Sequence, residues 1–336
     1  SACHFVSEST IVAPSCSRPR AADAAIALVA LLLAGGGCRA ASAEERSPLR
    51  AAPAGASAPE VDWKAVDAAF GRPGVIQAGE VHRYNFPRSD LTVTVRDPRG
   101  DVVLRPAFAL GGWIAMHAEG TGADVMAMGD LVLTEDELPR VMSRLQDGGV
   151  EQTAVHHHVM RESPRVLYMH VHAKGDAVRL ANTVREAVAL TGAPAATSTA
   201  TPAAPAALDT TAIAAALGHT GRSNGGVYQV SAPRPETITA GGHAIPGAMG
   251  LGTVMNFQPT GNGRAAITGD FVMTAPEVNR VIRALRANGI EVTSLHNHML
   301  DDEPRLFFMH FWANDDAVKL ARGLRAGLDN TTIRPQ

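Results

Sequence analysis

Cysteine, aromatic residues and excess basic charge are all scarce in this sequence of 336 residues. It contains three cysteines, 4% aromatic residues and a net charge of −3 at neutral pH. Such a chain lacks both the positive surface that attracts a phosphate backbone and the aromatic side chains on which bases stack. The composition therefore argues against a nucleic-acid partner. The length still allows two domains, each with a core of its own.

The N-terminal region has the layout of an export signal. Arg18 and Arg20 precede an apolar run over residues 24–34, and three glycines then lead to Cys38. A basic region, a short apolar segment and small residues are typical of a secretory signal. The run is shorter than the roughly 20 residues that a membrane-spanning helix needs. We expect residues 1–38 to be a signal peptide that ends in a lipobox, with Cys38 as the lipidated residue.

This prediction places the protein outside the cytoplasm. We expect a bacterial lipoprotein in the periplasm or at the cell surface, with its lipid anchor in the membrane. Cleavage before Cys38 would remove the other two cysteines, so the mature chain would have no disulfide and no free thiolate ligand. Any metal site must then use histidine and carboxylate ligands.

Two stretches rich in Ala, Pro, Ser and Thr divide the rest of the chain and are typical of linkers. Between and after them lie two copies of one sequence, because residues 129–188 and 269–328 agree at 24 of 60 positions without a gap. The predicted order is a linker at 39–60, repeat domain 1 at 61–191, a linker at 192–208 and repeat domain 2 at 209–330.

Each copy alternates strand and helix signals. In the first copy, residues 129–133 predict a strand, and Thr134 with Glu137 predicts a capping box at the start of a helix. The buried face of that helix is predicted to be Leu138, Val141, Met142 and Leu145. Gly149 stands where a left-handed residue ends a helix. The second copy repeats these signals 140 positions later.

The rest of each copy predicts a sheet with helices packed on it. Strands are expected at about 150–159 and 165–173, followed by a helix from Asp176. Upstream, residues 62–70 predict a short helix and residues 81–117 predict several strands. Each domain is therefore predicted to be α+β, with a mostly antiparallel sheet. The β-α-β-β-α order is compatible with a ferredoxin-like arrangement.

Histidines carry the strongest chemical signal. Each copy has a His-x-His pair on a predicted strand and a third histidine on the next strand, namely His156, His158 and His170, then His296, His298 and His310. Alternate residues of a strand share a face, so each pair points one way. The third histidine joins that face only if the cross-strand register has the right parity.

Converging imidazoles of this kind predict a divalent metal site, most readily zinc. Asp130 and Asp270, on a neighbouring strand, are further candidates as ligands or as partners of a histidine N–H. Glu162 and Asp302, in the loop between the two strands, are candidates for coordination or for a catalytic base. The alternative interpretation is that the histidines are polar members of a half-buried sheet and hydrogen-bond to backbone.

An arginine in each copy follows the same loop. Arg165 and Arg305 could bind a small anionic ligand through a bidentate fork. Equally, they could form ion pairs with the loop acids Glu162 and Asp302.

Three blocks of sequence resemble the LppY/LpqO family of bacterial lipoproteins. They are Gly-Asp-Leu-Val-Leu-Thr-Glu-Asp-Glu (129–137), Leu-His-Asn-His (295–298) and Glu-Ser-Pro-Arg-Val-Leu-Tyr-Met-His (162–170). The resemblance covers both repeats and implies a lipid-anchored, two-repeat architecture. It implies no biochemical activity.

Three hypotheses follow. The preferred one is an exported, lipid-anchored protein that binds a divalent metal, and with it a small anionic ligand. The second is a metal-dependent lyase or hydrolase with a three-histidine site. The third is a structural envelope protein without a ligand. Whether each repeat has its own site, or one site lies between them, is left open by the sequence.

Overall fold

The computed structural model describes residues 60–120, 122–194 and 207–336. The expected signal region, Cys38 and nearly all of both expected linkers lie outside these residues. Residues Gly55–Gln336 form one compact unit, which holds both copies of the repeat. None of the helices in the described part of the chain is long and apolar enough to cross a membrane.

Each repeat forms a six-stranded antiparallel sheet with the same strand order. The first sheet runs β1 (Val75–Gln77), β2 (Val81–Pro87), β5 (Gly111–Ala118), β6 (Asp124–Thr134), β9 (Val166–Asp176) and β7 (Glu151–His156). The second runs β10 (Gly221–Asn224), β11 (Val227–Pro233), β14 (Gly252–Gly261), β15 (Arg264–Thr274), β18 (Leu306–Asp316) and β16 (Glu291–His296). The predicted α+β class with two tandem domains is confirmed.

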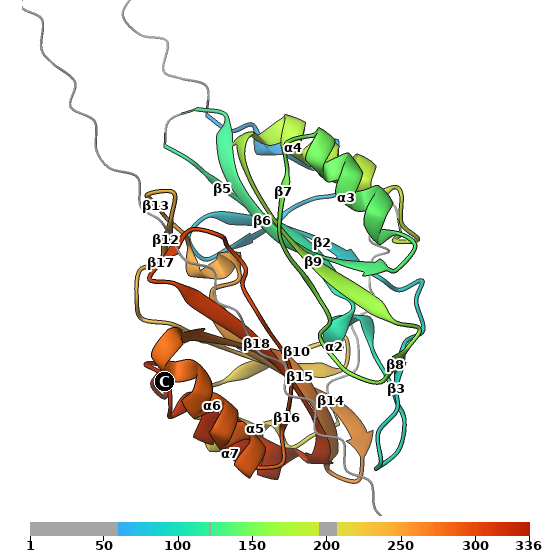
Figure 1. The fold of residues 1–336 in the computed structure, drawn as a ribbon, viewed down its shortest axis with the longest axis vertical. Coiled ribbons are helices and arrows are strands. Elements are labelled where there is room, and N and C mark those ends of the chain that lie inside the picture. Colours follow the sequence, from blue (N-terminus) through green and yellow to red (C-terminus); the bar gives the residue numbers. More distant parts are fainter. Residues whose placement is uncertain (1–59, 121, 195–206) are drawn as a thin grey trace, which may run out of the picture. The chain divides into compact units, whose positions relative to one another are not determined.

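Three helices pack on the outer face of each sheet (Figure 1). They are α1 (Trp63–Phe70), α3 (Leu138–Asp147) and α4 (Ala177–Val188) in the first repeat, and α5 (Thr210–Leu217), α6 (Ala275–Ala287) and α7 (Ala317–Leu328) in the second. Each repeat thereby encloses a core of its own between helices and sheet. On the helix face of α3, Val141 and Leu145 are fully buried, as the apolar spacing predicts.

The opposite faces of the two sheets meet each other. Two further core clusters combine buried residues of both repeats: Met128 lies in one with Phe308, and Phe108 lies in the other with Trp312. The short helices α2 (Pro106–Ala109) and η1 (Gly247–Met249) contribute to these clusters. The faces on which the histidines were predicted are therefore the faces buried between the repeats.

The two copies of the predicted capping box differ. In the second copy Thr274 and Glu277 form the complete box, and α6 begins at Ala275. In the first copy the Glu137 carboxylate still accepts the Thr134 N–H at 2.8 Å, but a turn intervenes and α3 begins only at Leu138. Pro139, early in α3, suits a first helical turn because its nitrogen has no proton to donate.

In each repeat, the loop between the two strands that carry the histidines forms part of a small separate sheet. In the first repeat β8 (Glu162–Ser163) pairs with β3 (Thr94–Val95), which also pairs with β4 (Val102–Val103). In the second repeat β17 (Asp302–Glu303), β12 (Thr239–Ala240) and β13 (His243–Ala244) form the counterpart. In each repeat the loop then passes through a cis proline, Pro164 or Pro304.

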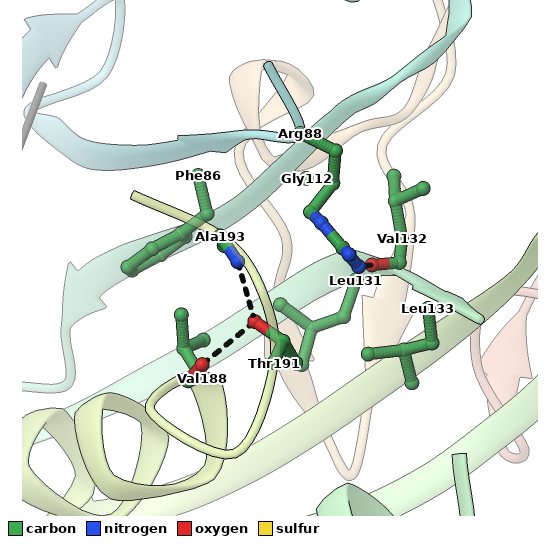
Figure 2. A pocket seen from close by; sticks show the side chains of 9 residues that line it. All are labelled: Phe86, Arg88, Gly112, Leu131, Val132, Leu133, Val188, Thr191 and Ala193. Atoms are coloured by element: carbon green, nitrogen blue, oxygen red, sulfur yellow. Dashed lines mark hydrogen bonds between the residues drawn. The ribbon is translucent and has the colours of Figure 1, made fainter. Parts of the chain in front are cut away.

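A buried arginine joins the first helix of the shared motif to the sheet in each repeat. Arg88 donates to Glu137 at 2.7 Å and to the Val132 carbonyl oxygen at 2.7 Å. Figure 2 shows the small, mainly apolar hollow beside Arg88, and none of the predicted metal ligands lines it. Arg234 makes the equivalent contact with Glu277 at 2.7 Å, with both side chains at most 3% exposed.

We expect the Arg234→Met variant to lose about 3–5 kcal/mol of unfolding free energy, because removing one partner leaves the Glu277 carboxylate buried without its counter-charge. Lys319→Met is the matched control, since Lys319 is 61% exposed and pairs with Asp315 on the surface. We expect it to change stability by less than about 1 kcal/mol. Urea unfolding followed by circular dichroism measures both, and similar losses in the two variants would contradict this account.

Candidate metal centre

Six histidines from both repeats meet between the two sheets. They are His156, His158 and His170 of the first repeat and His296, His298 and His310 of the second, and they are called the six-histidine cluster from here on. The rings of His156 and His296 stack at 3.8 Å between centroids. The histidines that the sequence predicts as ligands in the two repeats therefore lie together.

The cross-strand register puts the third histidine of each repeat on the same face as the pair. In the first repeat His156 lies opposite Tyr168, and Ala154 lies opposite His170. These positions have equal parity, so His156 and His170 share a face. The second repeat has the same register, with His296 opposite Phe308. A β-bulge precedes the pairing in both hairpins.

Strand alternation does not position the second histidine of each pair. The predicted strand at 150–159 ends at His156, so His158 lies in the following turn. Its main chain is held by the other repeat, because the Thr293 hydroxyl donates to the His158 carbonyl oxygen at 2.6 Å. The reciprocal bond runs from the Thr153 hydroxyl to the His298 carbonyl oxygen at 2.7 Å. Each repeat therefore positions one histidine of its partner repeat.

The residue between the two histidines of each pair makes a further hydrogen bond to the other repeat. Asn297 donates from Nδ2 to the Thr153 carbonyl oxygen at 2.9 Å. His157 occupies the matching position, and its Nε2 lies 2.9 Å from the Thr293 carbonyl oxygen. The His157 imidazole and the Asn297 amide thus make equivalent hydrogen bonds to the backbone of the other repeat. This equivalence explains why the two copies differ at this position although the histidines on either side are the same.

Nitrogen atoms of the cluster are close enough to share a metal ion. The ligand atoms of His156, His158 and His310 lie within 4.8 Å of one another, and so do those of His156, His170 and His296. The Nε2 atoms of His156 and His310 are 3.1 Å apart. For comparison, two nitrogens on one tetrahedral zinc ion are about 3.3 Å apart, given zinc–nitrogen bonds of about 2.0–2.1 Å. The buried histidine groups can therefore hold a metal ion.

Two carboxylates complete the cluster. Asp130 lies directly opposite His170 across β6 and β9, and Asp270 lies opposite His310 across β15 and β18. Each approaches the last histidine of a pair: Asp130 Oδ2 is 3.5 Å from His158 Nε2, and Asp270 Oδ2 is 3.1 Å from His298 Nε2. Asp270 also groups with His296 and His310 as a set that can hold a metal.

Backbone carbonyl groups orient the third histidines. His310 Nδ1 lies 2.6 Å from the Gly269 carbonyl oxygen, so a proton on Nδ1 leaves the Nε2 lone pair free. His170 has the same relation to the Gly129 main chain. Glycine is required at both positions, because a Cβ would collide with a neighbouring strand: at Gly129 it would lie 2.5 Å from the Trp113 carbonyl oxygen.

Many polar atoms of the cluster have no partner within the chain. Buried nitrogens or oxygens without a hydrogen bond occur in His156, His158, His170, His296, His298, Asp130 and Asp270. A buried polar atom left unsatisfied costs about 1–3 kcal/mol. The interpretation in which the histidines are simply satisfied by backbone bonds therefore accounts for only part of the cluster, and the remaining atoms fit a metal.

Burial keeps the imidazoles in the form that binds metals. It lowers the pKa of all six cluster histidines, and that of His298 falls to about 3. Around His156 and His296 the neighbouring imidazoles lower the pKa further. Burial also raises the pKa of Asp130, and that of Asp270 to about 6. The histidines are therefore neutral at pH 7, each with a lone pair to donate.

The loop residues have other partners. Glu162 accepts the Val166 N–H at 3.1 Å, and desolvation raises its pKa to about 7 against the opposing effects of that bond and of Arg165. Asp302 accepts the Leu306 N–H at 2.5 Å and pairs with Arg305 at 2.7 Å. None of Glu162, Asp302, Arg165 or Arg305 belongs to a metal-holding group among the described residues. Arg165 is 68% exposed and lies 3.7 Å from Glu135.

Sequence reasoning did not identify the aromatic rings that support the cluster. Tyr168 stacks on His158 at 3.3 Å between centroids, and Phe308 stacks on His298 at 3.4 Å. Both lie two residues before the third histidine, and the two copies carry an aromatic residue at this position. That shared aromatic character was the available signal.

The chain belongs to a family described as Domain of Unknown Function (DUF1259), which matches residues 64–190 and 211–330. It is thus a tandem repeat of a domain without an assigned function. No curated protein matches it.

Two solved structures show a remote likeness. The trimeric bacterial microcompartment shell protein PduB is 14% identical over 76% of this chain and 92% of that chain, with a TM-score of 0.19. EtuB from Clostridium kluyveri is 9% identical over 75% of this chain and 89% of that chain, with a TM-score of 0.18. At these TM-scores the likeness supports no conclusion about this protein.

We expect the metal-free protein to lose stability as the pH falls from 7 to 5. Unfolded histidines have a pKa of about 6.5, above that of the folded cluster, so the unfolded state binds more protons in this range. Each histidine then removes up to about 1.4 kcal/mol per pH unit. Asp130, Asp270 and Glu162 act in the opposite direction, because their folded pKa is raised, but they are three groups against six.

Urea unfolding in the presence of a chelator, at pH 7, 6 and 5, measures this dependence. A free energy of unfolding that stays constant or rises on acidification would show that the six imidazoles are not buried in the neutral form.

Proposed function

We propose that this protein binds a divalent transition metal between its two repeats, and we favour zinc. The observation that carries the proposal is the convergence of six neutral imidazoles and two carboxylates from six strands and two turns. Three overlapping groups of these side chains have ligand atoms within 4.8 Å of one another. Their unsatisfied nitrogens are the atoms that a metal would use.

The ligand chemistry supports the choice of metal class. Imidazole suits zinc, copper, nickel and iron, whereas magnesium and calcium prefer oxygen ligands. No cysteine follows Cys38 in the sequence, so thiolate-dependent sites are excluded from the repeats. Histidine with a carboxylate is a common ligand set for zinc.

Burial favours a binding role over catalysis. A metal-dependent lyase or hydrolase keeps one position of its metal open to water or substrate. Here His170, His298 and His310 are only 3–5% exposed, and the other three histidines are half-buried, with the His158 side chain 14% exposed. Asp302, a candidate base, already accepts hydrogen bonds from Arg305 and from the Leu306 N–H in its own loop. The anionic-ligand hypothesis is likewise not favoured by Arg305, because that side chain already has a carboxylate partner.

We also propose that the protein acts in the cell envelope as a lipoprotein of the LppY/LpqO type. Support comes from the sequence alone: the basic, apolar and small-residue segments before Cys38. Metabolic labelling with a clickable palmitate analogue tests it, with label expected in the membrane fraction of wild type and none on Cys38→Ser. Unlabelled wild-type protein, or equal labelling of the variant, would reject the anchor.

Metal content tests the main proposal directly. We expect zinc to co-purify with the wild-type protein, to be removed by a chelator and to rebind. We expect the double variant His156→Ala/His296→Ala to retain less than about a tenth of it, because it removes a ligand from every three-histidine group. Metal at 100 times its dissociation constant should stabilise the wild type by about 2.7 kcal/mol.

Elemental analysis and thermal unfolding provide the readouts. His243→Ala is the matched control, since His243 is 55% exposed and pairs with Glu119 away from the cluster. It should bind metal as the wild type does. A wild-type protein that binds no zinc, copper, nickel or iron after reloading would refute the proposal.

A further inference from the structure

We infer that the six-histidine cluster binds two metal ions, each held by three histidines and one aspartate drawn from both repeats. This inference rests on the proposed metal-binding function. The first set contains His156, His158, His310 and Asp130; the second set contains His296, His298, His170 and Asp270. Each set takes its His-x-His pair from one repeat and its third histidine from the other.

The two sets repeat one geometry. The last histidine of the pair and the histidine from the other repeat have ring centroids 3.8 Å apart in both sets. The two histidines of the pair are 5.1 Å apart in both. The first histidine of the pair and the third histidine are 5.1 Å apart in one set and 5.2 Å in the other. The ligand atoms of the three histidines of the first set lie within 4.8 Å of one another, and the rings of the second set are placed in the same way.

Each of the two sets also contains one aspartate. Asp130 lies beside His158 in the first set, and Asp270 lies beside His298 in the second. Yet neither of these histidine Nε2 atoms has a hydrogen bond, and the other oxygen of each aspartate, Oδ1, is also unsatisfied. Close approach without a hydrogen bond is the arrangement expected of two ligands that face a common ion.

The number of ligands also requires a second ion. One tetrahedral ion uses four protein ligands at most. An ion held by His156, His170 and His296 would leave His158 and His298 buried with unsatisfied nitrogens. Two ions with four ligands each would use all eight side chains. The two carboxylates would also offset part of the charge of a cation pair.

The sets adjoin each other. Asp270 and His296 of the second set group with His310 of the first, and the rings of His156 and His296 stack at 3.8 Å. The two ions would therefore be neighbours, as in two-metal proteins generally. Because each ion takes ligands from both repeats, each would also fasten one repeat to the other.

Stoichiometry separates this inference from the proposed function. The full chain is stripped with a chelator, reloaded with zinc or cobalt(II), and assayed by elemental analysis and by the cobalt absorption spectrum. We expect two equivalents in the wild type. His158→Gln disables only the first set and His298→Gln only the second, so each should retain one equivalent, a two-fold loss.

His157→Asn is the matched control, because the second repeat carries Asn297 at this position and its amide makes the equivalent backbone bond. It should retain two equivalents. One equivalent in the wild type would overturn the inference and leave metal binding intact, whereas none would overturn both. Two equivalents in either glutamine variant, or none in a variant that circular dichroism finds folded, would also overturn the inference.

A second measurement needs no variant. Loaded with copper(II), the wild type should give an electron paramagnetic resonance spectrum with magnetic coupling between the two ions. Uncoupled copper at full occupancy would contradict two adjoining sets.

Discussion

The unfavourable burial of six imidazoles between two apolar sheet faces is the constraint on which the rest of this structure depends. Three of the rings are buried and three are half-buried, and most have a buried nitrogen without a protein partner. Burial lowers their pKa, so protonation cannot satisfy them either. A chain that keeps such an arrangement in both of its copies must recover the lost solvation elsewhere. Coordination to a metal, as we propose, would do so, because it uses the nitrogen lone pairs that burial leaves available.

Duplication explains how a single chain assembles this site. Each hairpin places the second histidine of its His-x-His pair past the end of a strand, where its own sheet no longer supports the backbone. The other repeat supplies that support through Thr153 and Thr293, whose hydroxyls bind the carbonyl groups of His298 and His158. Both three-histidine groups combine histidines of the two repeats. The two core clusters that both repeats share lie at the same interface as the histidines, so the stability of the fold and the proposed metal binding would depend on the same surface.

Local features of the fold could be predicted from the sequence, whereas the contacts between the two repeats could not. The helix α3, which ends just before the left-handed Gly149, and the class of the fold follow from spacing and from glycine chemistry. The six histidines and Asp130 and Asp270 could be named from the repeated pattern. The register that places His170 beside its pair could not, since a slip of one residue would reverse its direction.

Other parts of the site escaped prediction for a related reason. The exchange of histidines between repeats depends on how two sheets pack, which leaves no trace in the spacing of either copy. Arg88 and Arg234 were missed because their partners Glu137 and Glu277 were already assigned to helix capping, although each carboxylate does both. The importance of Thr153 and Thr293 arises only from the opposite repeat.

Anomalous X-ray diffraction from crystals of the zinc-loaded protein, recorded above and below the zinc absorption edge, tests the central claim most directly. The account predicts two neighbouring anomalous peaks inside the six-histidine cluster, one within bonding distance of the His156, His158 and His310 set and one within bonding distance of the His296, His298 and His170 set. An anomalous map with no peak in the cluster would contradict it.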